Sequence, residues 1–155
     1  MRKLALLLAV AALAGPTTAA ADSTSIVHMY GCVVAGGHVT APAGTELVVR
    51  QGWGAKNVGL VHDFLNAQTS TLSINGAAPI DVSDAYGPVT DGFAAFANVP
   101  TGVVLATGES ATFEFVVSLS HRILDGASFA NGEFGEPAFG GPGLLWDFTC
   151  TVTGG

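Results

Sequence analysis

The 155-residue chain has 12 acidic residues against five basic ones, and only 11% of its residues are charged. This acidic balance excludes the cationic surfaces that nucleic-acid binding and attraction to anionic lipid require. Hydrophobic residues make up 49% of the chain, which excludes intrinsic disorder, because disorder needs low hydrophobicity and high charge.

Residues 1–21 have the pattern of a secretory signal peptide. A positively charged start precedes an apolar run over 4–14, and small residues at 17–21 suit cleavage. The apolar run is too short to span a bilayer. Removal of this segment would leave a mature chain, 22–155, with a formal charge of −9 and the length of one domain. We therefore expect a secreted, extracellular protein without membrane attachment after cleavage.

Short alternating segments predict strands in the first half of the mature chain. The first strand is expected over 24–34, and a turn at 40–45 leads into a second strand over 46–51. The following apolar residues recur at spacings of three and four, which favours one short helix near 56–66. The same apolar residues leave a strand over 60–65 open as an alternative.

Turn signals divide the middle of the chain into further strands. Residues 70–75 alternate between apolar and polar side chains and end in Asn75-Gly76, a pair typical of a tight hairpin turn, so a return strand is expected over 79–83. Another strand is predicted over 93–98. The Pro-Thr-Gly sequence at 100–102 is expected to turn the chain.

The last third holds the clearest strands. Residues 111–120 place Phe113, Phe115, Val117 and Leu119 on one face of a strand, and 144–153 close the domain with Trp146 facing inward. Between them, 125–143 form a long loop rich in glycine and phenylalanine. This succession predicts an all-β fold, an antiparallel β-sandwich of about seven strands.

Two cysteines, Cys32 and Cys150, lie near opposite ends of the mature chain. On the predicted alternation, both face the aromatic-rich sides of their strands. Disulfides persist outside the cell, and no C-x-x-C pair indicates a redox or metal site. We therefore predict a structural disulfide that ties the first strand to the last.

The histidines do not have the spacing of a transition-metal site. His28, His38, His62 and His121 lie in four separate segments, without the close pairs that zinc and copper sites use. No metal site of this kind and no cofactor are expected.

A weak calcium candidate consists of Asp81, Asp84 and Asp91, which occupy one polar stretch. Extracellular calcium sites use such oxygens, but the run lacks the D-x-D-x-D pattern that concentrates ligands at a turn. Aspartates at strand ends also form turns without any ion, and this interpretation is favoured.

Nucleophilic catalysis has little support in the sequence. There is no G-x-S-x-G or S-x-x-K motif. Ser120 and His121 are adjacent, and neighbours on a strand point to opposite faces. The alternation therefore predicts that these two side chains do not pair, and no catalytic residue is assigned.

Five aromatic residues form a candidate ligand surface. Trp53 lies between two glycines, and the others belong to polar or loop segments: Tyr86, Phe129, Phe134 and Phe139. Exposed aromatic rings can stack on sugars or seat peptides. The favoured alternative is that these rings cover the open ends of the sandwich, because exposed apolar patches are rare on monomers.

A resemblance starts from Leu105-Ala106-Thr107-Gly108-Glu109-Ser110 and the alternating residues after it. This L-x-x-G-E-S turn, with the turn and strand over 40–49, resembles immunoglobulin-like domains of bacterial secreted and cell-surface proteins. The whole chain also resembles secreted proteins of high-GC bacteria. The likeness implies an immunoglobulin-like fold but no activity and no site residues. The cysteine pair departs from the antibody pattern, because it joins the first and last predicted strands.

These observations favour a monomeric, non-catalytic binding or structural module. Its partner would be an extracellular carbohydrate or protein, bound at the end that carries Trp53 and the loops 84–92 and 125–143. One alternative is a small secreted hydrolase or metal-dependent enzyme that uses His62, His121 and the loop carboxylates. A second alternative is a protease-inhibitor-like module that presents the 125–143 loop.

Overall fold

The computed structural model describes residues 23–90, 94–126, 129–130, 133–134 and 140–155, and it describes no side chains between 127 and 139. Strands account for 53% of the described residues and helices for 16%, which confirms that the chain is mostly β. The predicted signal peptide, 1–21, lies outside the described residues.

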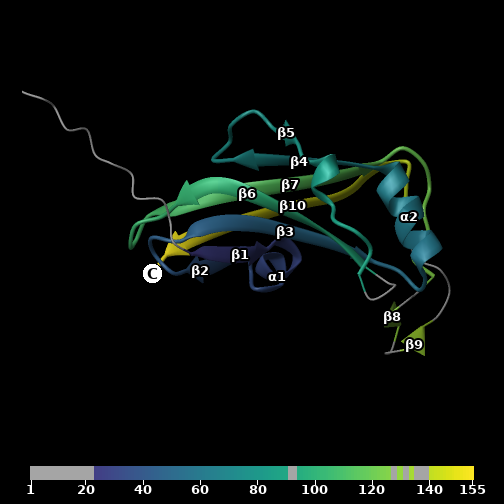
Figure 1. Cartoon of the computed structure of the whole chain (residues 1–155), viewed down its shortest axis with the longest axis horizontal. Helices are drawn as coiled ribbons and strands as arrows, with labels where there is room; N and C mark the ends of the chain where they lie inside the picture. Colours follow the sequence, from purple (N-terminus) through teal and green to yellow (C-terminus); the bar gives the residue numbers. More distant parts are fainter. Residues whose placement is uncertain (1–22, 91–93, 127–128, 131–132, 135–139) are drawn as a thin grey trace, which may run out of the picture.

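The strands form two main sheets (Figure 1). In order across the smaller sheet lie β1 (Thr24–His28), β3 (Glu46–Gly54) and β6 (Ala94–Val104). Across the larger sheet lie β2 (His38–Ala41), β10 (Gly143–Gly154), β7 (Ser110–Leu119), β4 (Gln68–Ile74) and β5 (Ile80–Asp81). A separate pair joins β8 (Phe129–Ala130) and β9 (Glu133–Phe134).

Both main sheets are mixed, so the prediction of an antiparallel fold is wrong in two places. β1 runs parallel to β3, and β2 runs parallel to β10. A parallel pair needs a long connection, and the chain between β1 and β3 supplies it by passing through a helix and through β2 in the other sheet. Side-chain alternation reports which face is buried but carries no information on strand direction.

The first helix, α1 (Met29–Val34), replaces the second half of the strand predicted over 24–34. Met29 and Cys32 are its buried residues, three positions apart on one side of the helix. The strand interpretation is therefore wrong after His28. In Figure 1, α1 lies beside β1, away from the end that carries the second helix.

The second helix, α2 (Val58–Ala67), confirms the helix predicted near 56–66 and excludes the strand alternative. It begins at Asn57, whose side-chain oxygen accepts the Leu60 N–H at 3.1 Å. It buries Val61, Phe64 and Ala67. A short 3₁₀ helix, η1 (Ser83–Ala85), follows β5.

The predicted turn at 100–102 is wrong, because β6 continues to Val104. The pairing of β3 with β6 instead changes register between Glu46 and Val48, and Gly102 has a φ of 67°. The Thr101 hydroxyl donates to the Leu47 carbonyl at 2.7 Å, which holds the irregular segment onto β3. Proline and glycine here mark a bulge in the strand, which local sequence does not distinguish from a turn.

One hydrophobic core includes the inward faces of both sheets. On β7 the alternation predicted from sequence is confirmed, with five inward side chains that are all buried: Ala111, Phe113, Phe115, Val117 and Leu119. Leu47 and Val49 of β3 are fully buried in the same core. The core therefore joins strands far apart in the sequence.

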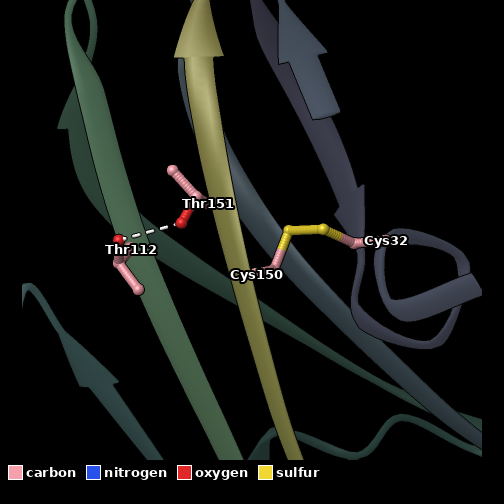
Figure 2. Close-up of a disulfide and its surroundings, with 4 residues drawn as sticks. All are labelled: Cys32, Thr112, Cys150 and Thr151. Atoms are coloured by element: carbon pink, nitrogen blue, oxygen red, sulfur yellow. Dashed lines mark hydrogen bonds between the residues drawn. A yellow bond between two sulfur atoms is a disulfide. The ribbon is translucent and has the colours of Figure 1, made fainter. Parts of the chain in front are cut away.

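The predicted disulfide between Cys32 and Cys150 is present, with Cα atoms 5.8 Å apart (Figure 2). It joins β10 to α1, so Cys32 reaches the bridge from a helix and not from a strand. Both cysteines are buried. On the other side of β10, the hydroxyl groups of Thr151 and Thr112 are hydrogen-bonded at 3.1 Å, which links β10 to β7.

The bridge closes a loop of 118 residues, so its removal should destabilise the fold strongly. Chain entropy predicts a loss of about 4–5 kcal/mol in the free energy of unfolding for the Cys32→Ala/Cys150→Ala variant. The matched control, Thr151→Ala on the same strand, should lose only about 1 kcal/mol. Urea unfolding under non-reducing conditions measures both, and equal losses in the two variants would contradict the prediction.

Gly52 allows a close approach of Phe96 to β3. A Cβ atom at position 52 would lie 2.4 Å from Cδ1 of the Phe96 ring. The Arg50 guanidinium lies 4.6 Å from the centroid of the same ring, an attractive cation–π distance. The ring therefore lies against β3 only because residue 52 has no side chain.

Gly52→Ala should lower the free energy of unfolding by about 1–3 kcal/mol, because the new methyl group displaces the Phe96 ring. The loss should largely disappear when the same substitution is made in a Phe96→Ala background. Gly140→Ala is the control, since a Cβ there meets nothing within 4 Å. Equal losses in both backgrounds would show that the ring is not the cause.

Candidate functional site

Trp53, the centre of the aromatic surface predicted from sequence, is buried with 3% of its surface exposed. It lies on the inward face of β3, where its ring stacks on Phe64 of α2 at 4.9 Å and contacts Trp146 of β10 at 5.3 Å. Its flanking glycines continue the strand and do not form a turn. Trp53 is therefore part of the core, and Trp146, expected there, is only half-buried.

Tyr86 is also turned inward. Its ring lies edge-on to Phe64 at 5.4 Å, and its backbone pairs with Ala97 of β6. Burial raises the pKa of its hydroxyl to about 12. Neither Trp53 nor Tyr86 thus belongs to an exposed platform. Phe129 and Phe134 are described only as backbone in β8 and β9, and Phe139 lies outside the described residues.

A different apolar surface is exposed beside β1. Among the described residues, eight large apolar side chains are exposed, and four of them fall within nine consecutive positions: Ile26, Tyr30, Val33 and Val34. Tyr30 and Val34 are 66% and 70% exposed. The Tyr30 ring contacts half-buried Phe148 of β10 at 6.3 Å, so it lies against the sheet. Sequence reasoning missed this surface because it assigned 29–34 to the first strand and not to a helix.

Next to this surface lies a groove of about 310 Å³. It is lined by 25–28 on β1, by Gly31 and Cys32 on α1, and by 39–42 in and after β2. β1 and β2 are the edge strands of the two sheets, so the groove marks the gap between the sheets on this side. Cys32 lines the groove, and its disulfide to Cys150 connects this wall of the groove to β10.

The aspartates proposed for calcium do not form a site in the described part of the chain. The Asp81 carboxylate accepts the Ser83 N–H at 2.9 Å, and hydrogen bonds from the Ser83 side chain and backbone lower the pKa of Asp81. Asp84 lies in η1, and Asp91 is outside the described residues. No group of three or more His, Cys, Asp or Glu side chains that could hold a metal occurs among the residues described.

Ser120 and His121, expected to point apart, are in contact. The Ser120 Oγ lies 3.2 Å from His121 Nδ1, and His121 Nε2 lies 3.0 Å from Asp63 Oδ1 of α2. The prediction is wrong because β7 ends at Leu119, so the strand alternation no longer applies. The side chains of His121 and Asp63 are 51% and 42% exposed. His62, also named from sequence, is exposed on α2.

Comparisons with known proteins assign no family: no protein-family model, curated protein or solved structure matches the chain. Across the residues described, every helix is too short or too polar to cross a membrane.

The raised pKa of Tyr86 makes the free energy of unfolding depend on pH in the alkaline range. The folded-state pKa is about 12 against an ordinary value of 10.0, so the unfolded chain loses its proton first. Stability is fully retained below pH 10 and should fall by about 2 kcal/mol as pH rises to 12. Tyr86→Phe should remove this part of the fall. Urea unfolding below pH 10 and near pH 12 tests it, and identical pH profiles for the two proteins would contradict it.

Proposed function

We propose that the mature chain is a secreted, extracellular module with an immunoglobulin-like sandwich fold, and that its role is to bind an extended segment of a protein partner. The fold proposal is supported by the strand order of the two sheets, in which the last strand, β10, lies between β2 and β7. It is also supported by the L-x-x-G-E-S segment. There the Ala106 N–H donates to the Glu109 carboxylate at 2.9 Å, and Gly108 has a φ of 82° at the turn before β7.

The observation that carries the binding proposal is the concentration of exposed apolar side chains beside the groove. Ile26 and Tyr30 remain exposed at 50% and 66% on adjoining elements, β1 and α1. A short helix tied down by a disulfide holds Tyr30, so little conformational entropy would be lost when a ligand covers it. Contiguous apolar surface on a small extracellular domain is typical of an interaction site.

The groove favours an extended peptide over other ligands. It runs between two strand edges, and edge strands bind partners by pairing with an added strand while pockets take alternate side chains. The mature chain carries a formal charge of −9, which repels a second copy of itself and favours a neutral or basic partner. A carbohydrate remains the competing ligand, and peptide selection together with a glycan array separates the two.

A neutral or basic peptide selected from a phage-displayed library on the mature, oxidised protein should bind at β1 and α1. Tyr30→Ser and Val34→Ser should each weaken its affinity about tenfold or more, because they remove apolar contact area at the centre of the site. Amide chemical-shift mapping locates the peptide, and fluorescence anisotropy measures its affinity.

The matched control is Ile80→Ser on β5, where the side chain is 55% exposed and lies on the edge strand at the other side of the larger sheet. This change should leave the affinity unaltered. Peptides that map away from β1 and α1, or binding of glycans from an array with no selectable peptide, would overturn the proposal.

A further inference from the structure

We propose that Ser120 is an acylatable nucleophile, activated by His121 and oriented through Asp63, and that this gives the chain an acyl-transfer activity towards small carboxylic esters. The three residues form one hydrogen-bonded row: Ser120 Oγ to His121 Nδ1 at 3.2 Å, and His121 Nε2 to Asp63 Oδ1 at 3.0 Å. This site is separate from the groove and does not rest on the binding role.

The carboxylate of Asp63 determines where the imidazole carries its proton. An ionised carboxylate can only accept a hydrogen bond, so Nε2 of neutral His121 must donate to it. Nδ1 then keeps its lone pair and faces the Ser120 hydroxyl, which becomes the donor. This is the arrangement in which an imidazole acts as general base towards a serine, with a third group orienting the base.

The fold holds these residues in place through the pairing of β4 with β7. Asp63 lies on α2, which leads directly into β4, and β4 pairs with β7 in a register that places Gln68 opposite Leu119. The Ser120 N–H then donates to the Ala67 carbonyl at 2.8 Å, which fixes the nucleophile against the end of α2. Asp63 thus lies on a helix, while Ser120 and His121 directly follow the last residue of β7, held to the end of α2 by this backbone hydrogen bond.

Exposure determines the class of substrate. With His121 and Asp63 half exposed, an ester can reach the hydroxyl from solution, but water is not excluded from the site. We therefore expect slow turnover and a preference for small esters with good leaving groups.

The reaction balances with water as the only co-reactant. The Ser120 oxygen attacks the ester carbonyl carbon, and its proton moves to His121 Nδ1. The C–O bond to the leaving group breaks, and that group takes the proton as an alcohol or phenol. Water, deprotonated by the same nitrogen, then hydrolyses the acyl-serine, so one ester and one water yield one acid and one alcohol.

The test uses the mature, oxidised protein with p-nitrophenyl acetate and with a fluorophosphonate probe, followed by peptide mass spectrometry. We expect one acetyl or phosphonyl group on Ser120. Ser120→Ala should abolish labelling at this position, and His121→Asn should slow it about a hundredfold or more. Asp63→Asn should slow it about tenfold or more while leaving the thermal unfolding midpoint close to that of the parent.

Three controls keep the result specific: Ser118→Ala two residues earlier on β7, His62→Asn beside Asp63 on α2, and Asp84→Asn in η1. All three should leave labelling of Ser120 unchanged. Nitrophenol release that persists in Ser120→Ala and disappears in His121→Asn would mean direct imidazole catalysis and would overturn the proposal. Absence of any label on Ser120 in the folded parent protein would overturn it as well.

Discussion

The disulfide between Cys32 and Cys150 is the constraint on which the arrangement of the first third of the chain depends. A helix of six residues has little stability of its own, and the covalent link to β10 keeps α1 where it is. Because α1 lies between β1 in one sheet and β2 in the other, its position determines how the two edge strands face each other. The groove and the exposed Tyr30 both follow from this link.

Five aromatic rings form one connected series that runs from the surface into the core. From Tyr30 at the surface, contacts pass through Phe148, Trp146 and Trp53 to Phe64, with centroid separations of 4.9–6.3 Å. The buried end joins α2 to both sheets, and the exposed end lies beside α1. The same packing that stabilises the fold therefore supports the proposed binding surface from beneath, which limits its motion and favours a preformed site.

The apolar surface beside β1 and the polar site at the end of β7 differ in physical character. The one beside β1 is apolar and bordered by strand edges, which suits recognition of a main chain. The one at the end of β7 is polar and centred on the Asp63–His121 pair, which suits proton transfer. Both combine segments that are distant in the sequence: α1 with β10 in the first, and α2 with the residues that follow β7 in the second.

Local sequence was enough to determine several features of this protein. The alternation on β7, the spacing of apolar residues on α2 and the turn at Asn75-Gly76 each reflect interactions within a few residues, and the structure agrees with all three. The disulfide was also predictable, because the chain has only two cysteines and its first 21 residues have the pattern of an export signal. Tertiary structure alone decided the rest: the parallel pairs, the helix at 29–34, the burial of Trp53, and the meeting of Ser120, His121 and Asp63. The physical reason is that each of these features depends on which faces of two elements pack against each other. Such packing joins segments that are distant in the sequence, and no local pattern connects them.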